Sequence, residues 1–336
     1  MVFATFFPSY YNSWVKIHLP HGAFLGNIDT FLKGFDPDKP DRLEITVSDK
    51  WMWIHPMVLS MIASLASNVD PKNIRCQEVT AKSGHYLKRM GLFDFLGKES
   101  KMDISEHDPS GRFVPLTRIR NSEELSRFIT EMIPLLHLER KWQAESIRHI
   151  MSELVRNVIE HAETLNGALV CAQYFKKSNT IRIGIADTGI GIRKSLSRAH
   201  STSSDLDAIK LAMVPGVTGA TRREGGTALN AGAGLFLIKS IAFTNRDFFV
   251  IYSGGAMYKL LKRKEVEELI LNANPDFDRH TVKEGLPVWR GTVIGIDISL
   301  DSTTEFTSML DLIRITYSKA VRERKKERYK KQAKFI

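Results

Sequence analysis

The chain has 336 residues, of which 43% are hydrophobic and 26% charged, the balance of a globular protein with a sizeable core. No run of 18 apolar residues occurs, and the aromatic N-terminal segment lacks the basic start of a signal peptide, so we expect neither a membrane-spanning helix nor secretion. Cys76 and Cys171 each lie in an apolar stretch. We therefore predict reduced core thiols in a cytoplasmic protein that has no membrane partner.

Residues 1–98 are predicted to form a small α/β domain. Its strands and helices are expected in the order 41–48, 57–67, 74–79 and 83–97. Pro56 suits the first turn of the first helix, and Ser83 is a candidate N-cap for the second. The polar, turn-rich residues 99–121 are interpreted as a linker.

Residues 122–302 are predicted to form a second, larger α/β domain. Helices are expected over 123–136, 142–161, 205–213 and 234–242, and strands over 169–175, 180–186, 247–254 and 291–300. Residues 259–287 are interpreted as a charged segment without a predicted element. The expected fold class is thus α/β with two domains.

The net charge of +10 is concentrated near the C-terminus. Residues 303–336 are predicted to form a C-terminal helix, and residues 318–336 of it hold nine Lys or Arg and two Glu. Such a tail suits non-specific nucleic-acid binding or an acidic partner, but a solvated, frayed helix end has the same pattern. The sequence leaves both readings open.

The segment ELVRNVIEH at 153–161 carries the first functional signal. Glu153, Asn157 and His161 are spaced by four residues, which places them along one face of a helix. A carboxylate beside a terminal phosphate can activate water as a general base, and an amide oxygen one turn further can ligate Mg²⁺. An ordinary solvated helix face is the alternative interpretation.

Two glycine-rich segments follow in order. In IADTGIGI at 185–192, Asp187 ends an apolar strand and can accept a hydrogen bond from an exocyclic amine, while Gly189 and Gly191 shape a turn. In GAGLFLIK at 232–239, Gly232 and Gly234 precede a helix whose N-terminal N–H groups can bind phosphate. For either segment by itself, an ordinary turn or an ordinary helix start is the alternative interpretation.

A fourth segment, GTVIGIDI, opens the last strand with Thr292, which is placed to support Asp187 or, alternatively, is a common strand residue. Together the four segments resemble the Bergerat-fold ATPase superfamily of gyrase-type topoisomerases, MutL, histidine kinases and anti-sigma-factor kinases, over about residues 140–300. The resemblance implies an α/β sandwich with a mixed sheet that binds ATP and Mg²⁺.

The resemblance also assigns roles within the site. It implies Glu153 as the water-activating base, Asn157 as the Mg²⁺ ligand and Asp187 as the acceptor of the adenine amine. Gly189, Gly191, Gly232 and Gly234 belong to the two glycine boxes, and Thr292 lies beside Asp187. Residues 193–231 are expected to be an ATP lid, from which Thr218, Arg222, Arg223 and Thr227 are candidates to reach phosphates.

Three hypotheses follow for the activity. The acid at position 153 favours a slow ATPase whose lid closure is coupled to an unidentified protein partner, or a serine/threonine kinase of the anti-sigma-factor type. A non-hydrolysing, ATP-gated scaffold is the third. No segment before the site resembles a phospho-accepting histidine helix, and only about 35 residues follow the last strand, so we expect neither a two-component sensor kinase nor a gyrase or MutL transducer domain.

The N-terminal region weakly resembles a STAS-like domain, the fold of anti-sigma-factor antagonists. Ser83 lies where a predicted strand leads into a helix, as the phosphorylated residue of such antagonists does, so an intramolecular kinase–substrate pair is one hypothesis and a simple helix N-cap the other. Superfamily members often work as dimers, so a homodimer is a further expectation.

Overall fold

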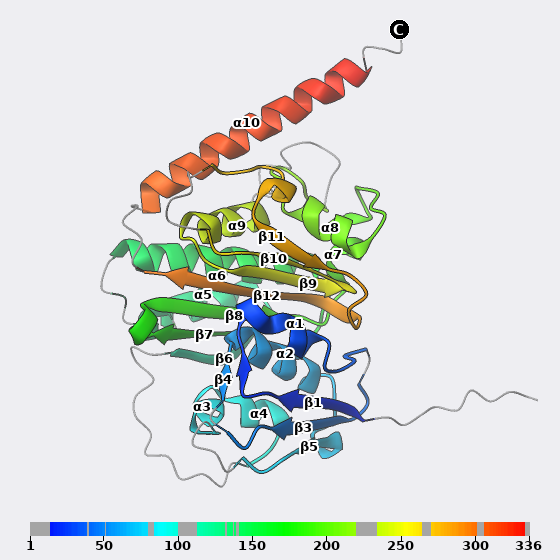
Figure 1. Cartoon of the computed structure of the whole chain (residues 1–336), viewed down its shortest axis with the longest axis vertical. Helices are drawn as coiled ribbons and strands as arrows, with labels where there is room; N and C mark the ends of the chain where they lie inside the picture. Colours follow the sequence, from blue (N-terminus) through cyan, green and yellow to red (C-terminus); the bar gives the residue numbers. More distant parts are fainter. Residues whose placement is uncertain are drawn as a thin grey trace, which may run out of the picture.

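The computed structural model has a mixed α/β fold in three layers. The residues it describes are 14–38, 40–50, 52–79, 84–99, 113–131, 133–136, 138, 141–219, 234–263, 270–300 and 306–332. Helices lie on one face of a large sheet, and an N-terminal unit, the described part of residues 14–99, lies on the other face (Figure 1). No helix among the described residues is long and apolar enough to cross a membrane.

The large sheet has seven strands in the order β11-β10-β9-β12-β8-β7-β6. Their bounds are β6 Phe113–Ile119, β7 Ala168–Phe175, β8 Thr180–Ala186, β9 Phe249–Gly254, β10 Ala256–Leu260, β11 His280–Lys283 and β12 Trp289–Ser299. Every described pairing in this sheet is antiparallel, so the expectation of a mixed sheet is wrong. The reason is that β12 inserts between β8 and β9, which run in the same direction, and keeps them from pairing.

Side chains alternate between the two faces of this sheet, as strand geometry requires. On β8, Ile183 and Ile185 join the core under the helices, whereas Gly184 and Ala186 face the N-terminal unit. The residue that follows, Asp187, therefore lies on the helical side at the end of the strand.

The helical layer completes the first core. Its helices are α5 Ser122–Glu131, α6 Lys141–His161, α7 Gly191–Leu196, α8 Asp205–Ala212, α9 Gly234–Thr244 and α10 Phe306–Gln332. Helix α10 forms as predicted: Met309 and Ile313 pack into the core, and the basic end extends away from the sheet (Figure 1). What the basic end binds stays a prediction.

The N-terminal unit contains three parallel strands, β1 Val15–Leu19, β3 Leu43–Val47 and β5 Ile74–Cys76. Its other elements are α1 Ile28–Leu32, α2 Pro56–Ala66, α3 Gly84–Arg89, α4 Leu92–Leu96 and the short strands β2 Gly22–Ala23 and β4 Trp53–Ile54. The 3-10 helices of the chain are η1 Leu25–Asn27, η2 Pro71–Asn73, η3 Ile133–Leu136, η4 Lys176–Ser178 and η5 Pro275–Phe277. The single helix predicted over 83–97 is divided at Gly91, whose φ is +73°. Ser83 lies outside the described residues.

Helix α2 joins the N-terminal unit to the large sheet. All of its residues are buried, because the helix lies between the small and the large sheet (Figure 1). The helix can approach the large sheet closely because Gly184 of β8 and Gly295 of β12 are paired and carry no side chains there. A Cβ on Gly184 would overlap backbone atoms of Pro56 and Met57.

Polar contacts cross the same boundary. The ring of His55 accepts a hydrogen bond from the Met57 N–H through Nδ1, so Nε2 carries the hydrogen and donates it to Asp297 at 3.1 Å. Lys259 pairs with Asp29 at 2.5 Å. The described part of the small α/β domain expected at 1–98 and the back of the large sheet therefore share one core.

Two boundaries predicted from sequence also differ from the structure. Residues 113–119, expected in the linker 99–121, form the edge strand β6, which pairs with β7. The charged segment 259–287 contains the end of β10 and all of β11, which pair with each other. Their charged residues hid the strand pattern because β11 lies at the edge of the sheet, where one side of the strand meets solvent.

The expected lid, 193–231, is only partly described, and the described part is not a loose cover. Residues 193–219 contain the end of α7 and all of α8. Their apolar side chains are buried in the core under the helices: Leu196, Leu206, Ile209, Met213 and Val217. Residues 193–219 therefore pack against the sheet, and the lid expected over 193–231 stays a prediction.

Candidate functional site

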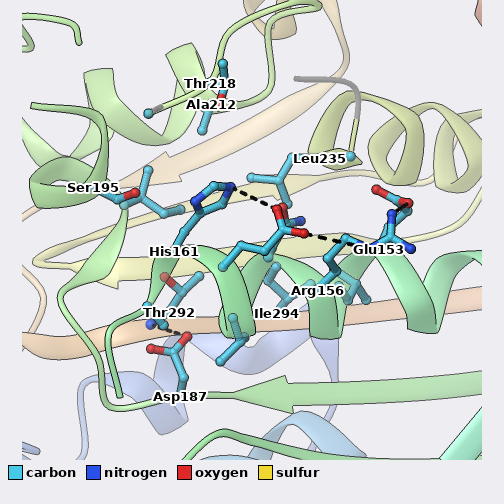
Figure 2. Close-up of a pocket in the computed structure, with 18 of the residues that line it drawn as sticks. Glu153, Arg156, His161, Asp187, Ser195, Ala212, Thr218, Leu235, Thr292 and Ile294 are labelled. Carbon is cyan, nitrogen blue, oxygen red and sulfur yellow. Dashed lines mark hydrogen bonds and ion pairs between the residues drawn. The ribbon is translucent and has the colours of Figure 1, made fainter. Parts of the chain in front are cut away.

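One cavity of about 330 Å³ lies between the sheet and helices α6, α7 and α9 (Figure 2). It brings together most of the site residues predicted from sequence: Glu153, Asn157, Asp187, Gly191, Gly234 and Thr292. Gly189 supports the site from outside the lining, and Gly232 lies outside the described residues. Figure 2 shows Asp187 and Thr292 at one end of the cavity and Glu153 at the other.

The acid and the amide of the first motif reach the cavity because α6 is amphipathic. Leu154 and Val158 pack into the core, and this leaves Glu153 and Asn157 on the edge that faces the cavity. Asn157 Nδ2 is buried and has no hydrogen-bond partner within the described structure. An unpaired buried amide is costly, so this group is suited to a polar ligand.

The first residue of α9 meets these two side chains. A Cβ on Gly234 would lie 3.2 Å from Glu153 Oε2 and 3.2 Å from Asn157 Nδ2. Any larger residue would fill the space between the helix N-terminus and the two polar groups. This end of the cavity therefore combines a helix N-terminus, a carboxylate and an amide, the chemistry of a phosphate and Mg²⁺ site.

At the other end, Asp187 is held by the backbone. Its Oδ1 accepts from Gly189 N at 2.8 Å and its Oδ2 from Thr292 N at 3.2 Å. Its own N–H donates to Thr292 O at 3.0 Å, and Trp289 Nε1 donates to Asp187 O at 2.9 Å. The carboxyl is thus fixed in place before any ligand arrives.

Burial raises the pKa of Asp187 to about 7, and the hydrogen bonds from Gly189 and Thr292 oppose the rise. The residue is 1% exposed, in agreement with desolvation as the dominant cause. A carboxyl with this pKa changes its charge near neutral pH. Once ionised, it gains from any additional donor that a ligand brings.

The glycine turn after Asp187 is locked by Ser253 of β9. Ser253 Oγ accepts from Ile192 N at 3.0 Å and donates to Gly291 O at 2.7 Å. Gly191 needs its φ of +75°, and a Cβ on Gly189 would overlap the Ala162 carbonyl oxygen. Sequence reasoning missed Ser253 and Trp289, because neither belongs to a local motif and each contacts the site only through the tertiary fold.

The remaining cavity-lining charges come mainly from α6. Arg156 Nη1 lies 3.1 Å from Glu153 Oε1 and Arg156 Nε lies 4.0 Å from Glu160 Oε1. His149 and His161 also line the cavity, and burial lowers the pKa of both rings. Both histidines are therefore mainly neutral at pH 7.

Of the candidate lid residues, Thr218 is described and lines the cavity, with its carbonyl oxygen 3.1 Å from His200 Nε2. Arg222, Arg223 and Thr227 lie outside the described residues. No family model matches this chain, and no curated protein matches it either.

Proposed function

We propose that the cavity binds ATP with Mg²⁺ and hydrolyses it slowly, as the resemblance to the Bergerat-fold superfamily implies. The observation that carries the proposal is the polarity of a single cavity. A buried carboxyl suited to an amine lies at one end, and a helix N-terminus with an acid and an amide lies at the other. A volume of about 330 Å³ falls in the range of small-molecule sites.

Asp187 would receive the exocyclic amine of adenine. Its two oxygens already accept backbone N–H groups, so its position does not depend on the ligand. A base that carries a carbonyl at the same position would place two acceptors against each other, and this costs binding free energy. Asp187 therefore supports a preference for adenine over hypoxanthine or guanine.

Asn157 would supply one oxygen to Mg²⁺, an ion that takes few protein ligands and keeps water and phosphate oxygens. The missing Cβ of Gly234 leaves room beside the Asn157 amide for this assignment, and the unpaired Nδ2 could donate a hydrogen bond to a phosphate oxygen. The bound ion would neutralise charge on the phosphates. The N–H groups that begin α9 would hold the phosphate oxygens.

Glu153 would act as the general base. It takes a proton from a water molecule whose oxygen attacks the terminal phosphorus. The bond from that phosphorus to the bridging oxygen breaks, and ADP leaves with the electron pair. The proton then passes from Glu153 to the products.

The test compares Glu153→Gln with Glu145→Gln, which changes an exposed glutamate on the same helix outside the cavity lining. We expect Glu153→Gln to keep ATP binding and to lose phosphate release by a factor on the order of 100 or more, while Glu145→Gln resembles the native protein. Equal turnover in both variants would exclude Glu153 as the base. Absence of ATP binding in the native protein would refute the proposed function.

Coupling of nucleotide state to a protein partner remains part of the proposal, with the described N-terminal unit as the candidate contact. Phosphotransfer to a partner would appear in the same assay as labelled protein. ATP-gated binding without turnover would appear as nucleotide binding without phosphate release. The intramolecular kinase hypothesis stays a prediction, because Ser83 lies outside the described residues.

A further inference from the structure

Arg156 is a cavity-lining residue to which the mechanism above gives no role. It lies one turn after Glu153 on α6, and its guanidinium binds Glu153 Oε1 at 3.1 Å. The other oxygen of the same carboxylate, Oε2, is the one that faces the start of α9 at Gly234. The arginine therefore lies beside the proposed phosphate end, held there by the proposed base (Figure 2).

The charge of the lining makes this position important. Three carboxyl groups line the cavity, those of Glu153, Glu160 and Asp187. Arg156 is the single Lys or Arg among the described lining residues, and the lining histidines His149 and His161 have lowered pKa values. A polyphosphate entering this cavity meets mostly negative charge, so its terminal group gains most where a guanidinium is available.

We propose that Arg156 is a phosphate-binding residue that distinguishes a nucleoside triphosphate from a diphosphate by exchanging Glu153 for the terminal phosphate. The proposal rests on the proposed nucleotide site. Arginine suits the exchange because its planar fork binds a carboxylate and a phosphate in the same bidentate way. Half of the Arg156 side chain is exposed, which leaves the guanidinium free to turn toward a ligand.

The exchange has a consequence for Glu153. While Arg156 binds Oε1, a lone pair of the carboxylate is engaged and its capacity to accept a proton is reduced. A terminal phosphate that takes the arginine releases the carboxylate beside the attacking water. A diphosphate lacks this terminal group, so under this proposal the base would be released only when the hydrolysable substrate is present.

The test measures dissociation constants of a non-hydrolysable ATP analogue and of ADP, each with Mg²⁺, by calorimetry. Native protein is compared with Arg156→Gln and Arg156→Lys. Arg148→Gln is the matched control, because Arg148 is an exposed arginine on the same helix outside the cavity lining. Thermal unfolding of each variant checks that the fold is retained.

We expect Arg156→Gln to weaken binding of the analogue by on the order of tenfold to a hundredfold and that of ADP by less than about twofold. Arg156→Lys should keep part of the preference, and Arg148→Gln should leave both constants unchanged. Equal effects on the binding of both nucleotides, or no effect on either, would overturn the role of Arg156 and leave the proposed nucleotide site intact. That result is expected if the ion pair with Glu153 only stabilises the helix. Native protein that binds neither nucleotide overturns both proposals.

Discussion

The pKa of Asp187 makes the adenine contact testable by pH alone. With a pKa of about 7, the carboxyl is about 9% ionised at about pH 6 and about 91% ionised at about pH 8. The ionised form accepts a hydrogen bond from an amine more strongly than the neutral form does. Affinity for an adenine nucleotide should therefore rise about tenfold across this interval, in proportion to the ionised fraction.

The phosphates of the ligand also titrate near pH 6 to 7, so the assay uses a ratio. Inosine diphosphate has the phosphates of ADP but a carbonyl in place of the amine. The ratio of its dissociation constant to that of ADP should rise about tenfold between about pH 6 and about pH 8. His161→Gln should keep this rise, because burial lowers the pKa of that ring and so moves its titration away from that of Asp187. A ratio that stays constant within about twofold would refute the reasoning about Asp187.

The raised pKa of Asp187 also affects folding. Nucleotide affinity should rise with pH, whereas the stability of the ligand-free protein should fall. The pKa of Asp187 is raised in the fold, so its contribution to stability is complete below about pH 4 and is lost as the pH rises through about 7. The difference between the unfolded value of 3.8 and the folded value of about 7 corresponds to about 4 kcal/mol. Asp187→Asn should remove this loss between about pH 5 and about pH 8, as denaturant unfolding would show.

Three further changes test the fold around the site through the free energy of unfolding. Gly184→Ala should cost at least about 3 kcal/mol, because its Cβ would overlap the backbone of α2. The control Gly285→Ala should cost about 1 kcal/mol, because Gly285 has a φ of +67° but no atom near its Cβ position. Similar losses in the two variants would contradict the docking of α2. His55→Ala should cost about 3 kcal/mol, because Asp297 loses a buried donor, and an unchanged midpoint would argue against that contact. Ser253→Ala should cost about 2 kcal/mol and also weaken ADP binding, and unchanged binding would show that the turn keeps its shape without the hydroxyl.

Elements with strong local signals were predictable from the sequence. Helix α2 begins at Pro56 as expected, since proline is favoured at the first helical position. Helix α6 follows the spacing of its apolar residues, and β8 follows its isoleucines up to Asp187. The motif residues then meet in one cavity because each lies at the end or on one face of such a local element.

Pairings between distant segments were beyond the sequence. Strand β11 is short and polar, and it becomes a strand only because β10 offers it hydrogen-bonding partners. The insertion of β12 between β8 and β9 turned an expected mixed sheet into an antiparallel one. Such pairings depend on contacts between residues far apart in the chain, and periodicity does not record them.

By itself, the sequence singled out residues that line one cavity in the structure: the acid and amide of α6, the carboxyl after β8 and the glycine that begins α9. Only the tertiary structure decided what surrounds them. Burial of Asp187 sets its pKa near 7, Ser253 and Trp289 hold its loop, and Arg156 binds Glu153. The physical reason is that desolvation, long-range hydrogen bonds and ion pairing depend on which surfaces meet, whereas residue type and spacing specify only the local element.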